Sequence, residues 1–416
     1  MLPKLAYVTH YYPFRGGYGN IVADQLRFLS RHFDIHLFYF FKKEDDSENI
    51  DISRFIVKEH ALETGFKQIV PSSELGKARL GLLRDWNLLY RMVKNHILHG
   101  VQLYFAPYYS ENAVKKIACT IKTENIRYLW AYSAFGGAIC KEMAFDRKFL
   151  YLCDSFGYLY HNLSKIEKNP FMKLFLIWNS RASAAFELSI RKHYDRIAFI
   201  NADDAKWLGL KPHEYAILRH MRGKTIFRQT KKGYDLVLAG YWGYLPNADS
   251  LEYALERIFP KLKRKCTVLV VGMNLGKKLQ ARLMQAKNVH AVYRGNVDDY
   301  FGAISSARLF LLPIRAGAGT CNKLLDGLEA GLPVLTTPFL KGGHDKGSKC
   351  RAIISCNNED EFANRIEQLL GDGSMRSKLG MEGRKFYLEE FSNAEKEYEK
   401  AVKLMLGKAK KARGSA

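Results

Sequence analysis

Short apolar runs alternate with segments of helical periodicity along most of the chain, a pattern that predicts parallel β-sheets flanked by helices. Near the N-terminus, apolar runs at 5–9 and 35–41 enclose a glycine-rich loop and a segment, 20–32, whose apolar residues recur at helical spacing. Further buried strands are predicted at 128–132, 149–153 and 196–201. The first two of these are followed by polar or glycine residues, and the carboxyl ends of parallel strands are where such sheets bind ligands.

The alternation becomes more regular after residue 235. Strands are predicted at 236–239, 267–271, 289–293, 309–312 and 334–337. Helices are predicted between them and over 359–370 and 374–406, and one more is expected at 75–99 in the first half. The fold class is therefore α/β, with two Rossmann-like doubly wound domains. We place the domains at 1–215 and 235–385, with a linker at 216–234 and a terminal helix and basic tail at 386–416.

Composition agrees with a folded protein of two domains, since 416 residues exceed the usual size of one core. Seven scattered cysteines without a Cys-x-x-Cys pair predict neither a disulfide framework nor a zinc site. No apolar run reaches the roughly 20 residues that a membrane-spanning helix needs. We expect a cytoplasmic protein, and the net charge of +23 favours an acidic partner such as an anionic membrane face, nucleic acid or a phosphate-rich small molecule.

One glycine loop in the second half leaves a buried strand and opens a helix. Gly317 and Gly319 lack side chains there, so backbone N–H groups and the positive end of the helix can approach a phosphate closely. Arg315 and Lys323 could neutralise a diphosphate, and Asp326, on the same helix face as Lys323, could accept hydrogen bonds from a ribose. The pattern predicts a nucleotide-binding loop, although the Lys–Asp pair in isolation is more typical of a surface ion pair.

Residues 235–343 resemble the C-terminal domain of glycosyltransferase family 4, which has the GT-B fold. The matching pieces, in order and spacing, are Leu238 to Asn247, Val270 to Gly272, Gly295 to Tyr300, Leu312 to Thr320 and Lys323 to Val334. The resemblance implies that Gly240, Tyr241 and Thr320 join the glycine loop in binding a nucleotide-sugar donor. It also implies retention of the anomeric configuration and terminal helices that return toward the first domain.

The resemblance assigns roles at further positions. Asp326 stands where the family has the second glutamate of its paired-glutamate motif, which contacts the ribose, while the first glutamate falls at Ala318 and is missing. Gly16 and Gly17 resemble the family's glycine loop beside the donor diphosphate and acceptor. Asp154 resembles a strand-end residue that is catalytic in some members, although an aspartate after a strand is more often a cap or turn residue.

The expected activity is transfer of a sugar from a nucleotide-sugar co-substrate to a glycan or lipid-linked acceptor, at the cytoplasmic face of the membrane. Stabilising the departing diphosphate is the main chemical task, and no cofactor or metal is expected because the chain has no Asp-x-Asp triplet to hold one. Three alternatives stay open: a nucleotide-sugar epimerase of the same fold, a nucleic-acid-binding or modifying protein, and an inactive sugar-binding module. Nucleic acid is disfavoured because no reader motif occurs.

Overall fold

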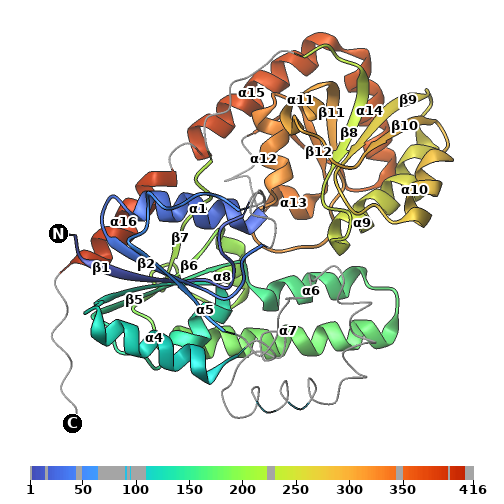
Figure 1. Ribbon diagram of the computed structural model, residues 1–416. Helices are drawn as coiled ribbons and strands as arrows, with labels where there is room; N and C mark the ends of the chain where they lie inside the picture. The colour runs from blue at the N-terminus through green and yellow to red at the C-terminus, as the bar shows by residue number, and fades with distance from the viewer. Residues whose placement is uncertain are drawn as a thin grey trace.

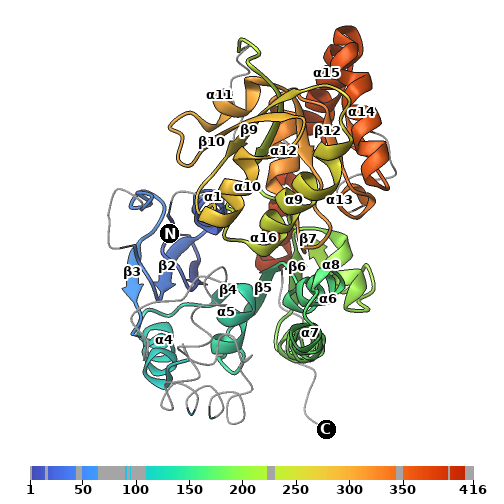
Figure 2. The same cartoon turned by 90° about the vertical axis from the view of Figure 1, so that its right-hand side faces the viewer.

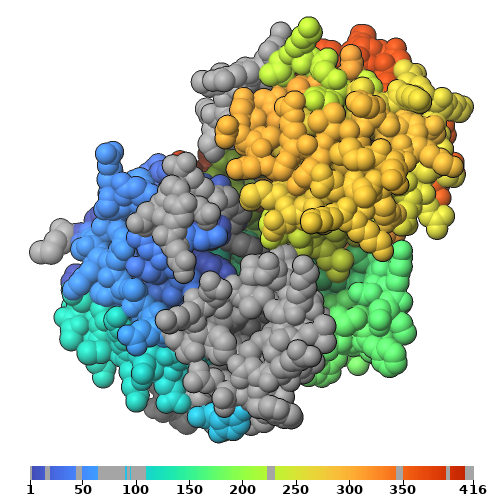
Figure 3. All heavy atoms as spheres, turned by 45° about the vertical axis from the view of Figure 1, so that its right-hand side comes forward, coloured from blue at the N-terminus to red at the C-terminus, as the bar shows by residue number. Residues whose placement is uncertain are grey.

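The computed structural model describes residues 2–14, 17–43, 49–63, 90, 94, 109–222, 230–342, 350–391 and 394–407. Two parallel sheets form two domains, the first coloured blue to green and the second yellow to orange in Figures 1 and 2. The space-filling view in Figure 3 shows the two domains side by side in the same colours. This arrangement confirms the expected α/β fold with two Rossmann-like domains. Of the helix expected at 75–99, only residues 90 and 94 are described. Gly16 and the basic tail lie outside the described residues.

Among the described residues, the first sheet has seven strands in the order β3-β2-β1-β4-β5-β6-β7. The strands are β1 (Lys4–Val8), β2 (Asp34–Tyr39), β3 (Lys58–Ala61), β4 (Tyr128–Tyr132), β5 (Arg147–Cys153), β6 (Arg196–Phe199) and β7 (Tyr215–Ile217). The helices are α1 (Gly17–Leu29), α4 (Glu111–Thr123), α5 (Ser133–Cys140), α6 (Phe156–Ile166), α7 (Pro170–Arg191) and α8 (Ala202–Trp207). The order reverses between β1 and β4, and ligands of open α/β sheets bind beside such a reversal.

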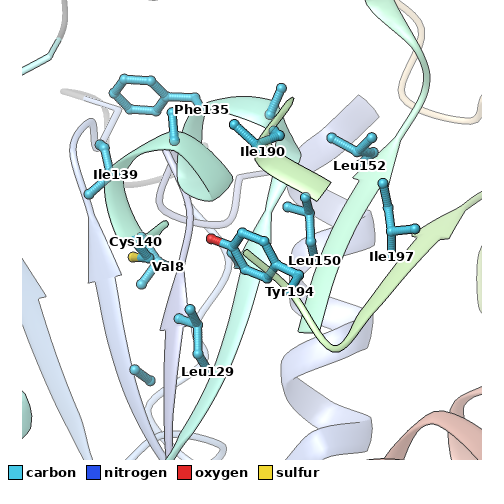
Figure 4. Packing of buried hydrophobic residues seen from close by; sticks show 14 of the residues in the cluster. Val8, Leu129, Phe135, Ile139, Cys140, Leu150, Leu152, Ile190, Tyr194 and Ile197 are labelled. Carbon is cyan, nitrogen blue, oxygen red and sulfur yellow. The ribbon is translucent and has the colours of Figure 1, made fainter. Parts of the chain in front are cut away.

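The central strands of the first sheet are largely apolar on both faces because helices cover both faces. Alternate residues therefore enter two different cores: Val8 contributes to one cluster and its neighbour Tyr7 to the other. Figure 4 shows the first cluster, in which Leu150 of β5 packs near Tyr194. The Tyr194 hydroxyl donates to the carbonyl of Gly137 at 2.7 Å, so this buried polar group is satisfied.

The second sheet has six strands within the described part of the chain, in the order β10-β9-β8-β11-β12-β13. They are β8 (Tyr234–Ala239), β9 (Cys266–Val271), β10 (Val289–Arg294), β11 (Ala307–Leu312), β12 (Val334–Thr336) and β13 (Ile353–Ser355). The helices are α9 (Leu245–Tyr253), α10 (Lys277–Met284), α11 (Tyr300–Ser305), α12 (Asn322–Glu329), α13 (Pro338–Gly342), α14 (Glu359–Gly371) and α15 (Gly373–Phe391). A π-helical turn, Ala254–Ile258, and a short 3-10 turn, Phe259–Lys261, continue α9. The order reverses between β8 and β11, as it does in the first sheet.

The last helix, α16 (Ala394–Leu406), packs on the first domain beside α1, as Figure 1 shows. Tyr398 is fully buried (0% exposed) in the first domain's core, and its hydroxyl accepts a hydrogen bond from Gln25 Nε2 at 3.0 Å. Glu397 accepts from the backbone N–H of Arg219 at 2.9 Å and also pairs with its guanidinium. The expected return of the C-terminal helices to the first domain is thus confirmed.

Candidate active site at the junction of the two domains

The loop after β11 contacts the hairpin formed by α6 and α7 of the first domain. Ala316 is fully buried (0% exposed) in a small apolar cluster with Leu163 of α6 and Leu176 of α7. The side-chain amide of Asn162 donates to the carbonyl of Gly317 at 2.9 Å. The glycine loop that the sequence predicted therefore lies at the junction of the domains.

Gly319 brings this loop against the carboxyl end of β5. Its φ is +66°, in the left-handed region that favours glycine. A Cβ atom added at this position would lie 1.9 Å from Asp154 Oδ1, far inside van der Waals contact. Cys153, the last residue of β5, also has a positive φ of +67°, which turns the chain so that Asp154 follows at the strand end. The two predicted elements, the glycine loop and Asp154, are thus in direct contact.

Asp204 on α8 connects the two domains by hydrogen bonds. Its Oδ1 accepts from the backbone N–H of Ser155 at 2.7 Å, and its Oδ2 accepts from the N–H of Gly319 at 3.0 Å. Asn201, the N-cap of α8, donates from its side-chain amide to the carbonyl of Gly319. The sequence analysis missed both residues, because Asn-x-x-Asp after a strand is typical of an ordinary helix start.

A second buried carboxylate supports the same strand end. Glu187 of α7 is 1% exposed and accepts hydrogen bonds from the Ser155 hydroxyl and the Phe156 N–H, each at 2.7 Å. Burial raises the pKa of Glu187 to about 7, although these donors act in the opposite direction. Burial, together with the charge of Asp154, raises the pKa of Asp204 well above the ordinary aspartate value. Burial thus shifts the pKa of both acidic groups upward, while their hydrogen-bond donors oppose that shift.

Asp326 lies on α12, where the chain between β7 and β8 crosses it. Its Oδ1 pairs with the guanidinium of Arg222, and its Oδ2 accepts from the Tyr300 hydroxyl at 2.9 Å. Arg222 also pairs with Glu329 at 3.2 Å. One turn nearer the start of α12, His220 Nδ1 lies 2.9 Å from Asn322 Oδ1.

Burial lowers the pKa of His220 to about 3, so its ring is neutral at physiological pH, and a hydrogen bond to Asn322 Oδ1 requires the ring hydrogen to be on Nδ1. Sequence reasoning missed Arg222 and His220, since a basic residue in a polar connection carries no signal of which helix it will meet.

The structure places Arg315 against its own domain. Its Nε and Nη2 donate to the two carboxylate oxygens of Asp249 at 3.0 and 2.6 Å. The guanidinium also lies over the ring of Tyr253, 4.7 Å from the centroid. The sequence predicted that this charge would neutralise a diphosphate, whereas the observed contacts direct it to α9.

Lys323 and Thr320 lie at the start of α12, both half-buried. Within the described residues, Lys323 forms no ion pair with an acidic side chain. No side-chain hydrogen bond caps the N-terminus of this helix. The first-turn N–H groups and the ammonium group of Lys323 therefore form a region of positive potential beside the glycine loop.

Gly240 and Tyr241 begin the loop after β8. A Cβ added to Gly272 would lie 1.9 Å from the carbonyl oxygen of Gly240, so the ends of β8 and β9 approach closely. Tyr241 is 37% exposed, and its hydroxyl accepts from Asn274 at 2.6 Å. Farther along this loop, burial and the charge of Asp154 raise the pKa of Tyr244, which places that hydroxyl near the junction.

In the first domain, Gly17 is the first residue of α1, and Gly16 is outside the described residues. Two further polar residues lie at adjacent strand ends: Ser133, with a positive φ of +66°, and His10, 3.3 Å from the Ser133 hydroxyl. Burial lowers the pKa of His10 to about 4, so its ring is neutral at physiological pH.

Within the described residues, no group of three or more His, Cys, Asp or Glu side chains is arranged to hold a metal ion. In the same part of the chain, no helix has the length and hydropathy needed to cross a membrane.

The family model described as "Glycosyl transferases group 1" matches residues 236–372, most of the second domain. This match confirms the resemblance drawn from the motifs of that domain. A search of curated proteins gave no match.

Solved structures show the same two-domain fold over nearly the whole chain. Sucrose-phosphate synthase of Thermosynechococcus elongatus is 14% identical, with a TM-score of 0.64 and 97% of each chain covered. WaaG, a glycosyltransferase involved in lipopolysaccharide biosynthesis, is 16% identical, with a TM-score of 0.59 over 97% of this chain and all of its own. HepE of Anabaena, solved with UDP and glucose, is 9% identical, with a TM-score of 0.63 over 97% of this chain and 100% of its own. The fold is therefore GT-B.

Proposed function

We propose that this chain, a GT-B protein whose second domain matches the group 1 glycosyl transferases, is an enzyme that moves a sugar from a nucleotide-sugar to a glycan or lipid-linked acceptor. One observation carries the proposal: the glycine loop of the second domain meets Asp154 at the end of a first-domain strand. A donor held by that loop would present its sugar to groups of the other domain. WaaG, named for lipopolysaccharide biosynthesis, and HepE, solved with UDP and glucose, support the choice of donor and acceptor.

The positive region at the start of α12 would stabilise the leaving diphosphate. Charge builds on the departing oxygen as the anomeric C–O bond breaks, so donors fixed in place before the reaction lower the barrier most. Lys323, the first-turn N–H groups and the Thr320 hydroxyl are the groups we assign to this role. Arg315 would instead hold the loop through Asp249.

Asp326 would accept hydrogen bonds from the ribose. Arg222 and Tyr300 each occupy one of its oxygens, and each carboxylate oxygen retains a further lone pair for a hydroxyl. These partners fix its direction before the nucleotide arrives. Gly240, Tyr241 and Gly17 would line the donor site, as the resemblance implies.

Asp154 would act on the acceptor hydroxyl, as a base or as an orienting group. Retention of the anomeric configuration and independence from metal form part of the proposal. Both follow from the resemblance to glycosyltransferase family 4 rather than from a contact at the junction.

The proposal is tested by donor turnover in the full chain. Thermal shift against a panel of nucleoside diphosphates identifies the nucleotide, because a ligand at 100 times its Kd adds about 2.7 kcal/mol to the free energy of unfolding. The matching nucleotide-sugars are then assayed for transfer to oligosaccharide and lipid-linked acceptors. Release of nucleoside diphosphate without transfer to any acceptor would favour an epimerase or a hydrolase and contradict the proposal.

Lys323→Ala tests the assignment of the leaving-group site. We expect a loss of about 100-fold in kcat/KM for the donor, the usual effect of removing one fixed donor of this kind. Lys277→Ala, an exposed lysine on α10 of the same domain, is the matched control and should leave kcat/KM unchanged. Equal effects of the two substitutions would contradict the assigned role.

We further propose that the exposed face of α7 rests on an anionic membrane that carries the acceptor. Large apolar side chains recur at helical spacing on this face: Phe171 (81% exposed), Leu174 (65%), Phe175 (37%) and Trp178 (49%). The opposite face of α7 packs on α6. Three exposed basic residues, Lys168, Lys173 and Arg181, lie on or beside the helix and would contact acidic headgroups.

Vesicle co-sedimentation tests the membrane contact. The protein should sediment with phosphatidylcholine vesicles that contain phosphatidylserine and stay in solution with phosphatidylcholine alone. Phe171→Glu combined with Trp178→Glu should abolish binding, whereas Met381→Glu, at a residue 66% exposed on α15, should not. Failure of the unchanged protein to bind acidic vesicles would remove the membrane from the proposed function.

A further inference from the structure

The first turn of α8 holds Gly319 by both its N–H and its carbonyl oxygen. Asp204 Oδ2 accepts from the N–H at 3.0 Å, and the side-chain amide of Asn201 donates to the carbonyl. The other oxygen of Asp204 accepts from the N–H of Ser155 at 2.7 Å, directly after Asp154. One carboxylate therefore joins the backbone of the donor-side loop to the backbone at the acceptor-side strand end.

A role for Asp204 in capping α8 does not account for these contacts. Asn201 already caps the helix, since its Oδ1 accepts from the N–H groups of Asp203 and Asp204 at 2.8 and 3.3 Å. Asp204 is also fully buried (0% exposed), and none of the ion pairs in the described part of the chain includes it. A buried carboxylate is costly without compensating donors, so its two backbone contacts, one from each domain, are what stabilise it there.

The bridge holds Gly319 of the loop next to Ser155, the second residue after β5. The Asp154 carboxylate lies against Gly319, where even a Cβ atom has no room. A displacement of about 1 Å between reacting groups can lower a rate on the order of 100-fold. Asp204 can therefore control where the glycine loop lies relative to Asp154 without contacting the donor or the acceptor.

We propose that Asp204 is a positioning residue for sugar transfer. By accepting hydrogen bonds from the N–H groups of Gly319 and Ser155, it sets the position of the glycine loop relative to Asp154. The inference rests on the proposed function, because it assigns these two elements to the donor and acceptor sides. Asn201 contributes to the same positioning because its side-chain amide donates to the carbonyl of Gly319.

Asp204→Asn tests the bridge, because an amide keeps the size of the side chain and leaves only one oxygen to accept two hydrogen bonds. We expect kcat to fall about 10- to 100-fold with the donor KM changed less than about threefold, since the groups that bind the donor remain. Asp203→Asn is the matched control. That neighbour on α8 is 37% exposed and faces Lys206 at 3.8 Å, so its kcat should stay at the wild-type value.

A double variant separates positioning from general loss of structure. If Asp204 acts through Asp154, then Asp204→Asn should lower kcat much less in an Asp154→Asn background than in the wild type. Additive losses would overturn the inference. If Asp204→Asn unfolds at the assay temperature, Asn201→Ser replaces it, because serine keeps an N-cap oxygen but loses the donor to Gly319. A wild-type kcat for Asn201→Ser would then overturn the inference.

The two failures are distinguishable. If the wild-type chain transfers sugar from none of the donors, the proposed function itself is wrong. If the wild type transfers sugar and Asp204→Asn has the same kcat as Asp203→Asn, only the role proposed for Asp204 is wrong.

Discussion

Replacing Gly319 by alanine should disable the enzyme while leaving both domains folded. The added Cβ would lie 1.9 Å from Asp154 Oδ1. Atoms of this kind do not approach closer than about 3 Å, so either the loop or the carboxylate must move by about 1 Å. An alanine at a φ of +66° adds a backbone cost of about 1–2 kcal/mol. A shift of this size at a reacting centre lowers a rate on the order of 100-fold.

Gly209 offers a control that separates the steric effect from the backbone cost. Its φ is +75°, and a Cβ added there meets no atom within 4 Å. Gly209→Ala should therefore lose about 1–2 kcal/mol of stability and keep its kcat.

The assay is kcat for sugar transfer, measured beside the free energy of unfolding in urea. A second check is Gly319→Ala with Asp154→Ala, where removal of the carboxylate should return part of the stability lost in Gly319→Ala. Wild-type turnover by Gly319→Ala, or an equal loss of turnover in Gly209→Ala, would refute the argument.

Three further substitutions test contacts elsewhere in the fold. Arg222→Gln should destabilise the protein by about 3–5 kcal/mol, because it removes a buried cation that pairs with both Asp326 and Glu329. Urea unfolding measures the loss, and a change below about 1 kcal/mol would contradict the prediction. Glu187 has a folded pKa raised to about 7, so its protonated form stabilises the fold and this contribution is lost as pH rises through 7. The wild-type free energy of unfolding should fall by up to about 3 kcal/mol between about pH 4.5 and pH 8, and Glu187→Gln should reduce that fall. The same pH dependence in both proteins would contradict the prediction. Tyr398→Phe should cost about 1–3 kcal/mol by leaving the Gln25 amide unpaired in the core, and an unchanged Tm would argue against that hydrogen bond.

Those parts of the fold that depend on local pattern were predictable from the sequence. The strands β1, β8 and β11 each contain a run of at least four apolar residues, and each overlaps the strand that the periodicity predicted. The edge strand β3, with the sequence Lys-Glu-His-Ala, was not predicted, because pairing on one side only leaves most of its side chains exposed and polar. The local sequence pattern therefore predicts the buried strands, whereas an edge strand forms because of the strand it pairs with.

The candidate site was predictable only in its glycine loop and strand end. Local composition marked Gly317 and Gly319, because glycines before a helix leave a signature within a few residues, whereas Asp154 was assigned through the resemblance to glycosyltransferase family 4. Asp204 and Arg222 act across more than 100 positions of sequence, on Gly319 and Asp326. Such contacts depend on the packing of one domain against the other, for which no spacing rule exists.

The return of α16 to the first domain means that the chain passes between the domains twice, once after β7 and once after α15. Arg219, just beyond β7, is bonded to Glu397 of α16, so the two crossings are fastened to each other on the first domain's side. The Arg219–Glu397 pair therefore joins the two connections where they leave the first domain, so the first domain anchors both connections at one place.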